Sequence, residues 1–266
     1  MFLNQTLPER LEERGISRRA FMQFCGVMAA TLALPARYRT TIAEALTEVE
    51  RPVLIWRQFQ DCAGNSESIL RSPHPEVAQI VLETLAWNYH ELIMAGSGEQ
   101  AEAMSTEAVQ KLKGKYIAVI EGAIPTGDGY CTIGGRSALD LAREVAGRAK
   151  FTIAVGACAW DGGLVQHGPT DGKGVQEVVP DANVVNLAGC PHNPANTVAV
   201  LVHYLTFNEL PELDRYKGSS RSSRRCRWRS ARRPRAPART PRPRARGSCT
   251  WWRPCTTRPG SACRSS

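Results

Sequence analysis

Three cysteines stand directly after apolar, β-rich runs of the sequence, where loops begin. They are Cys62, Cys158 and Cys190, and the runs before them span residues 53–56, 151–155 and 184–187. Taken singly, each is most simply interpreted as a small buried apolar residue. Taken together, they are three thiols that follow three strands, and thiolates are the ligands that hold iron–sulfur clusters in proteins. The pattern therefore predicts one metal centre to which all three loops contribute.

Glycines accompany the cysteines in these loops. A residue without a Cβ lets backbone amides approach a sulfur atom closely, and such hydrogen bonds tune the potential of a bound cluster. The glycines concerned are Gly64, Gly156, Gly162, Gly163 and Gly189. Their positions favour a cluster over three unrelated core cysteines.

The elements that must bring the loops together form an alternation of strands and helices. Runs typical of buried parallel strands occur at residues 53–56, 116–120, 151–155 and 184–187. Helical periodicity occurs at residues 76–89, 99–113, 137–149 and 196–206. This order predicts an α/β fold with a doubly wound parallel sheet, whose ligands bind beyond the carboxyl ends of the strands. All three cysteine loops are predicted at that edge.

The first 45 residues are predicted to be a twin-arginine export signal. Residues 17–22 read Ser-Arg-Arg-Ala-Phe-Met, an apolar stretch follows at 21–34, and Ala-Glu-Ala at 43–45 has the form of a cleavage site. The alternative is an amphipathic surface helix with an incidental arginine pair. Because the apolar stretch is shorter than the ~20 residues of a membrane-spanning helix, no transmembrane span is predicted.

Over residues 15–217 the sequence resembles the small subunit of NiFe hydrogenases. The resemblance rests on the arginine-pair leader and on the segments 62–68, 119–125, 130–135, 156–159, 189–191, 205–207 and 210–214. It implies a flavodoxin-like domain over residues 46–217 that holds a proximal 4Fe–4S cluster through Cys62, Cys158 and Cys190. It also implies a large-subunit partner that oxidises dihydrogen, so this chain would be the first electron relay and would carry no catalytic residue of its own.

The fourth ligand departs from the family pattern. Family members present Cys-x-x-Cys in the first loop, and Asn65 replaces the second cysteine here. An amide oxygen is a poor iron ligand beside thiolate, so Asp61 is the better candidate, with a bound water or a three-iron cluster as alternatives. Glu121 is either a proton-relay group near the cluster or a hydrogen-bonded turn carboxylate, and the sequence leaves both open. His192, a lone histidine beside a turn, is expected to be structural.

An Arg/Pro/Ser-rich tail at residues 218–266 stands in place of the cluster-binding C-terminal domain that the family normally carries. Residues 219–266 contain 15 Arg, no Asp or Glu, and no Leu, Ile, Val, Met, Phe or Tyr. Such a segment cannot bury enough apolar surface to offset roughly 1–2 kcal/mol of ordering entropy per residue, so disorder is expected. The composition indicates translation in a wrong reading frame, which would remove the medial and distal clusters. A basic arm that binds nucleic acid is the weaker alternative, so no nucleic-acid partner is expected.

The expected function is therefore that of an exported NiFe hydrogenase small subunit. The resemblance implies a location in the periplasm or on the outer face of the cytoplasmic membrane, with electrons passing to a membrane cytochrome b or another acceptor. Two alternatives stay open. One is an iron–sulfur electron carrier or quinone-reductase-like subunit without a hydrogenase partner, and the other is a truncated product without function.

Overall fold

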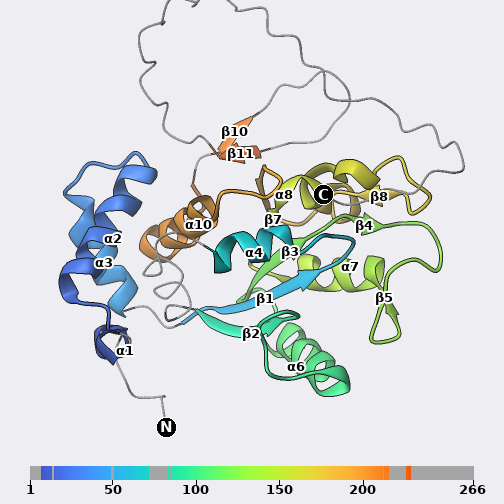
Figure 1. Ribbon diagram of the computed structural model, residues 1–266, viewed down its shortest axis with the longest axis horizontal. Coiled ribbons are helices and arrows are strands. Elements are labelled where there is room, and N and C mark those ends of the chain that lie inside the picture. The colour runs from blue at the N-terminus through green and yellow to red at the C-terminus, as the bar shows by residue number, and fades with distance from the viewer. Residues whose placement is uncertain are drawn as a thin grey trace, which may run out of the picture. The chain divides into compact units, whose positions relative to one another are not determined.

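A seven-stranded sheet with the order β10-β11-β9-β7-β3-β1-β2 organises the chain (Figure 1). The computed structural model describes residues 7–13, 15–48, 51–71, 83, 85–211, 213–215 and 226–228. Five adjacent strands form the parallel core of the sheet: β1 (Val53–Gln58), β2 (Ala86–His90), β3 (Ile117–Glu121), β7 (Phe151–Val155) and β9 (Val184–Leu187). Numbered among themselves they lie in the order 2-1-3-4-5, which is the flavodoxin-like arrangement. The predicted fold class is confirmed.

Helices connect the parallel strands and cover both faces of the sheet. They are α4 (Gly64–Leu70), α6 (Gly98–Lys111), α7 (Ala138–Arg148), α8 (Gly156–Asp161) and α10 (Pro194–Phe207). The helices predicted at residues 99–113, 137–149 and 196–206 are confirmed by α6, α7 and α10, with small shifts in their bounds. The predicted strands are confirmed by β1, β3, β7 and β9.

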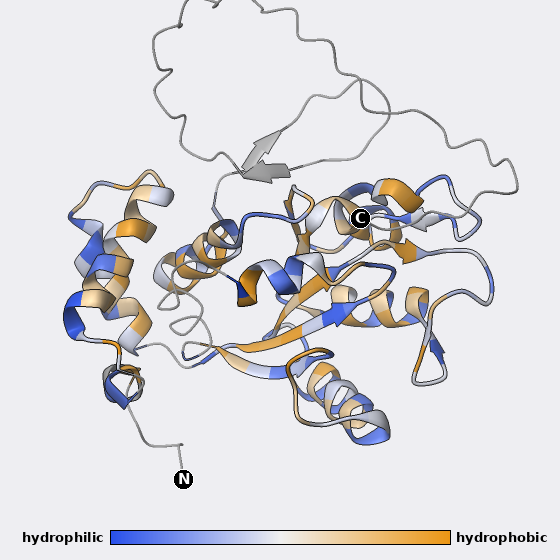
Figure 2. Cartoon of the chain, viewed as in Figure 1, coloured by the Kyte–Doolittle hydropathy of each residue, from blue (hydrophilic) through white to orange (hydrophobic). Residues whose placement is uncertain are grey.

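Alternation along the strands divides the core between the two faces. Leu54 and Trp56 of β1 pack into the core cluster that includes α10, whereas Ile55 packs on the other face with Ala118 and residues of α6. Successive strand side chains point to opposite faces, and here both faces are covered by helices. This explains why the strands are apolar over most of their length; in Figure 2, β1 is orange along its body and blue at its carboxyl end.

Several short elements lie in the connections that follow β3 and β7. Two antiparallel pairs and two short helices make up this set: β4 (Ile124–Pro125) with β8 (Gly172–Lys173), β5 (Thr132–Ile133) with β6 (Arg136–Ser137), the 3-10 helix η1 (Gly163–Val165), and α9 (Val175–Val178). They extend the strand-end loops beyond the sheet.

The helix predicted at residues 76–89 is wrong at its carboxyl end. Residues 86–89 belong to β2, which pairs with the edge of β1, while residues 72–82 and 84 lie outside the described residues. Trp87 and Tyr89 are aromatic residues that favour strands. Pairing with β1 supplies their backbone with hydrogen bonds, and helical periodicity in the sequence does not reveal that partner.

Among the residues described before β1, three helices occur, namely α1 (Leu7–Glu13), α2 (Arg18–Thr31) and α3 (Tyr38–Glu48). The helical pair α2–α3 packs together and also contacts α10. The arginine pair opens α2, and the Ala-Glu-Ala segment at 43–45 lies inside α3. Among the described helices, none is both long and apolar enough to cross a membrane.

One face of α2 explains why this segment folds. Phe21, Phe24, Cys25 and Met28 have the i, i+3, i+4, i+7 spacing of a helix face, and all four are buried in the core cluster that contains α3 and α10. The export signal predicted over residues 1–45 stays a prediction, and its apolar stretch forms a packed amphipathic helix.

The tail contributes one described segment, the strand β11 (Cys226–Trp228). It pairs with β9 at one register position and antiparallel with β10 (Leu213–Arg215). This strand departs from the expectation of disorder over residues 218–266. The edge of β9 offers free backbone N–H and C=O groups, which can pair with a segment of almost any side-chain composition.

Candidate metal centre

The three cysteine loops start at the carboxyl ends of β1, β7 and β9. Cys62 lies between β1 and α4, Cys158 lies inside α8, and Cys190 follows β9. Because these strands are parallel members of one sheet, their carboxyl ends share an edge (Figure 1). The sequence predicts the metal centre at this same edge.

The thiols differ in exposure and influence one another. Cys62 and Cys190 are exposed and Cys158 is partly buried. Burial raises the pKa of the Cys158 thiol, and Cys190 and then Cys62 raise it further, so the three groups are electrostatic neighbours. Within the described ranges, no three His, Cys, Asp or Glu side chains surround a single metal ion. An iron–sulfur cluster instead distributes its thiolate ligands over several iron atoms.

Glycines leave room around two of the sulfur atoms. A Cβ at Gly64 would lie 3.1 Å from Cys62 Sγ, and a Cβ at Gly163 would lie 2.8 Å from Cys158 Sγ. Any larger residue at Gly163 would also be strained, because its φ is +53°. Soft thiol donors that backbone approaches this closely, with no Cβ between, fit an iron–sulfur cluster.

The buried carboxylate of Glu121 connects the first cysteine loop to the sheet. Glu121 ends β3 and is fully buried. It accepts hydrogen bonds from the Asn65 N–H at 2.8 Å, the Ser66 hydroxyl at 2.5 Å and the Trp56 indole at 3.3 Å. A carboxylate is favoured at the amino end of a helix, where N–H groups lack partners. This geometry has the form of the hydrogen-bonded turn carboxylate, and the proton-relay role stays a prediction.

His90 at the end of β2 extends this network. Its Nδ1 accepts the Leu92 N–H at 3.2 Å, and its Nε2 lies 3.3 Å from Ser66 Oγ. Because Nδ1 is an acceptor, the proton of the neutral ring is on Nε2 and is donated to Ser66. Burial lowers the pKa of His90 to about 4, against the opposing charge of Glu121. The ring is therefore neutral at pH 7.

Asn65, at the position of the missing cysteine, contacts the turn that carries Cys190. Its side chain is buried, and its Oδ1 lies 2.9 Å from the backbone nitrogen of His192 and 3.0 Å from Nδ1 of the same residue. Nε2 of His192 lies 2.7 Å from Thr197 Oγ1 in α10. Burial lowers the pKa of His192 to about 4. The expectation that His192 is structural agrees with these contacts.

Asp61 lies directly before Cys62, and one of its two carboxylate oxygens accepts hydrogen bonds. Its Oδ2 accepts hydrogen bonds from the Ala63 N–H at 3.0 Å and from Gln58 Nε2 at 3.1 Å. Burial raises the pKa of Asp61, and the negative charge of Glu121 raises it further. A cation at this position would lower that pKa, because an opposite charge favours the ionised carboxylate.

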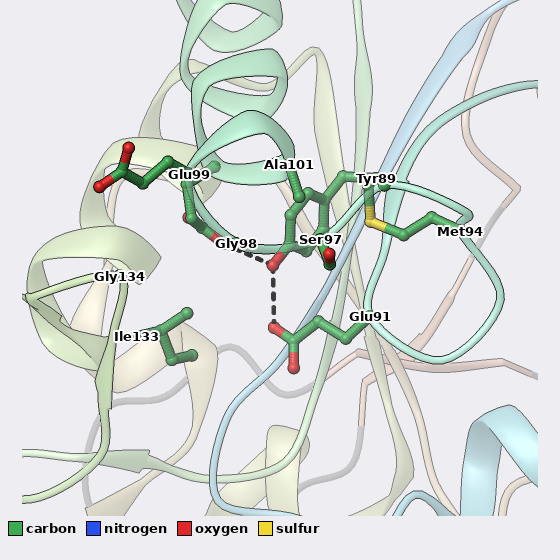
Figure 3. Close-up of a pocket in the computed structure, with 11 residues that line it drawn as sticks. Tyr89, Glu91, Met94, Ser97, Gly98, Glu99, Ala101, Ile133 and Gly134 are labelled. Carbon is green, nitrogen blue, oxygen red and sulfur yellow. Dashed lines mark hydrogen bonds between the residues drawn. The ribbon is translucent and has the colours of Figure 1, made fainter.

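A separate acidic pocket of about 570 Å³ lies beside β2 and the start of α6 (Figure 3). The Tyr89 hydroxyl donates to Glu102 at 2.6 Å and lies 3.4 Å from Glu91. The buried Arg57 makes two 2.8 Å hydrogen bonds to Glu102 and stacks 3.8 Å from the centre of the Tyr89 ring. Burial raises the pKa of Glu91. None of the three site cysteines lines this pocket.

Several residues that order the site were not singled out in the sequence. They are Gln58, Ser66 and His90. A signal existed for Gln58, because it lies just after an apolar run and so falls on the buried carboxyl end of a strand. The contact between Asn65 and His192 had no such signal, since 127 positions separate them.

Known proteins resemble the part of the chain that holds the site. Residues 62–204 match the model of the family described as NADH ubiquinone oxidoreductase, 20 Kd subunit. The Hydrogenase-2 small chain of Escherichia coli strain K12 is 40% identical over 208 residues, which cover 77% of this chain. The periplasmic NiFe hydrogenase small subunit 1 of Nitratidesulfovibrio vulgaris is 39% identical over 214 residues, covering 78% of this chain and 67% of that protein. The chain belongs to the NiFe hydrogenase small-subunit family.

Solved structures agree with this membership. The Ni-Fe-Se hydrogenase from Desulfomicrobium baculatum has a chain with a TM-score of 0.58 and 32% identity, covering 62% of this chain and 68% of that one. The actinobacterial-type NiFe-hydrogenase of Ralstonia eutropha H16, with a TM-score of 0.54 and 22% identity, supports the fold alone. The chain spans 56% of the length of the E. coli relative.

Proposed function

We propose that this chain is the electron-transfer small subunit of a NiFe hydrogenase and acts through one proximal iron–sulfur cluster. The observation that carries the proposal is the position of Cys62, Cys158 and Cys190 after three parallel strands, in a member of this family. Dihydrogen would be oxidised on a large subunit. The 4Fe–4S cluster, when bound, would take up the electrons and pass them on.

The residues of this chain bind and orient the cluster. The three thiols ligate it, and Asp61 is the proposed fourth ligand because its carboxylate adjoins Cys62, whereas the amide oxygen of Asn65 is turned to His192. A bound water or a three-iron cluster is the alternative. Glu121 holds the amino end of α4 through its hydrogen bonds to Asn65 and Ser66, and so sets the position of the Cys62 loop.

The partner and the location follow from the same proposal. A NiFe large subunit is the proposed partner, and a membrane cytochrome b or another acceptor receives the electrons. Arg18 and Arg19 are exposed at the start of α2, where an export receptor can reach them. Twin-arginine export would deliver the protein to the periplasm or to the outer face of the cytoplasmic membrane.

Iron analysis of the full chain after anaerobic reconstitution tests the site. We expect one cluster in the wild type and a loss of at least about half of the iron in Cys158→Ala and in Cys190→Ala, because each removes a thiolate. Cys131→Ala is the matched control, since this partly buried cysteine lies outside the three loops. Unchanged iron in both ligand variants would contradict the proposal.

The fourth ligand has its own test. Asp61→Ala is expected to lose one iron or to change the electron paramagnetic resonance spectrum of the reduced cluster, whereas Asn65→Ala keeps the iron count. The reverse result would move the ligand to Asn65. Co-purification with a co-expressed NiFe large subunit tests the partner, and a cluster-loaded chain that does not bind it would favour an electron carrier without a hydrogenase partner.

A further inference from the structure

We infer that Asn65 and His192 form a hydrogen-bonded clamp that holds the Cys62 and Cys190 loops together before any metal binds. The clamp stands where the family pattern has a fourth thiolate. Its significance for iron rests on the proposed function, but its geometry does not, because every contact is between residues of this chain.

The assignment of protons follows from the distances. A backbone N–H can only donate, so the Asn65 atom that lies 2.9 Å from the His192 nitrogen is the amide oxygen. The same oxygen lies 3.0 Å from Nδ1 of His192, so Nδ1 carries the ring proton. Nε2 is then the acceptor for the Thr197 hydroxyl at 2.7 Å. Both lone pairs of the Asn65 oxygen are engaged, so the oxygen is not left free for iron.

Asn65 also contacts the other strand-end loops. Its backbone N–H donates to Glu121 at the end of β3. A Cβ at Gly156, where α8 begins after β7, would lie only 2.5 Å from Asn65 Nδ2. The Ser68 hydroxyl lies 3.4 Å from the His192 carbonyl oxygen, which gives α4 a second contact with the turn after β9. The Asn65 side chain therefore contacts the segments that follow β7 and β9, and its backbone N–H contacts the end of β3.

The clamp changes what holds the site together. In a four-thiol site, the loops are joined at this position by a bond from sulfur to iron, which exists only when the cluster is bound. Here the two loops are connected by the two buried hydrogen bonds that the Asn65 oxygen accepts from His192. Buried polar networks of this kind favour a single arrangement of the groups they connect. The Cys62 and Cys190 loops are thus ordered in the cluster-free chain, and the cluster has three protein thiolates.

Amide hydrogen exchange of the full, cluster-free chain tests the clamp. Asn65→Leu keeps a similar size but removes the acceptor, and Asn65→Asp keeps the acceptor. We expect the His192 amide to exchange about tenfold faster or more in Asn65→Leu and at close to the wild-type rate in Asn65→Asp. The Ile120 amide in β3 is the control, because its exchange stays slow as long as the sheet is folded.

The wild type alone supplies a second measurement, which does not depend on a variant that folds. Nitrogen NMR of the His192 ring is expected to show the proton on Nδ1. A proton on Nε2, or a wild-type His192 amide that exchanges as fast as in Asn65→Leu, would overturn the clamp.

Iron analysis separates the clamp from the proposed function. A protected His192 amide in a chain that takes up no iron leaves the clamp standing and removes the cluster site. An unprotected His192 amide in a chain that binds iron through the three thiols would remove the clamp and leave the cluster site standing.

Discussion

The cysteine edge of the sheet and the helical pair α2–α3 are held by different forces. Buried hydrogen bonds order the cysteine edge, with Glu121 and Asn65 as the acceptors that several donors share. The helical pair is held by apolar side chains, among them Phe24 and Met28 of α2 and Ile42 of α3. Hydrogen bonds constrain both distance and direction, whereas apolar contact constrains mainly which face is covered. The more directional interaction is found at the strand ends that carry the three cysteines.

Helix α10 takes part in both regions. Thr197 near its amino end contacts the ring of His192, whereas Phe207 at its carboxyl end lies against the ring of Tyr38 in α3 at 5.9 Å between centroids. Its middle, from Val198 to Val202, is buried. Helix α10 is therefore one direct connection between the two regions, beside the core cluster that joins the helical pair to Trp56 and the sheet.

The largest effect is expected for Glu121→Ala. It leaves the buried donors of Trp56, Asn65 and Ser66 without their acceptor, so the free energy of unfolding should fall by about 3–5 kcal/mol. Urea denaturation followed by tryptophan fluorescence measures it. Glu121→Gln is the control, because it keeps one acceptor oxygen and should lose less. A loss below about 1 kcal/mol for the alanine variant would mean that water replaces the carboxylate as the hydrogen-bond acceptor.

A smaller and more local effect is expected for Met28→Ala in the helical pair. Met28 is 1% exposed, and its truncation should cost about 2–3 kcal/mol through the cavity it leaves. Hydrogen exchange should become faster in α2 and α3 while the amides of Asn65 and His192 keep their protection. Equal acceleration at both places would show that the two regions unfold together, and the comparison would fail.

Acid should weaken the cysteine edge of the cluster-free chain first. Burial lowers the pKa of His90 and of His192 to about 4 in the folded chain. Below about pH 6.5 the unfolded chain therefore binds more protons at these residues than the folded chain does. Their contribution to the free energy of unfolding is present above that pH and is lost between about pH 6.5 and 4. For the two residues together we expect a loss of about 1 kcal/mol at pH 6 relative to pH 7.

Urea titrations at both pH values measure this loss. The helical pair contains no histidine, so local exchange in α2, corrected for the intrinsic effect of pH, should not change. His192→Asn is the control and should remove about half of the dependence. A wild-type chain with equal stability at pH 6 and pH 7 would contradict burial of the two neutral rings.

The smallest effect is expected at a helix cap. The Ser17 hydroxyl accepts the Ala20 N–H at the start of α2, and Ser137 caps α7 in the same way. Ser17→Ala and Ser137→Ala should each lower the free energy of unfolding by about 0.5–1 kcal/mol. Thermal denaturation of the two variants compares them directly. A loss above about 2 kcal/mol at Ser17 would show that polar contacts also matter for the helical pair.

Local pattern was enough to predict most of the sheet. The runs that became β1, β3, β7 and β9 are apolar because both faces of the sheet are covered, and that requirement is visible in the sequence itself. The edge strand β2 was not predicted, because its strand conformation depends on pairing with β1. Nothing in residues 86–89 indicates which strand they pair with. The export signal over residues 1–45 stays a prediction, and the spacing of Phe21, Phe24 and Met28 shows the helix face of this segment in the sequence itself.

For the site, the sequence by itself determined the residue types and the strand ends that carry them. Cys62, Cys158 and Cys190 could be placed at one edge because parallel strands direct their carboxyl ends the same way. Only the tertiary structure decided what Asn65, Glu121 and His192 do. Each makes hydrogen bonds of about 3 Å to partners far away in the chain, and a bond of that range depends on which loops meet in space, which no local pattern of residues records.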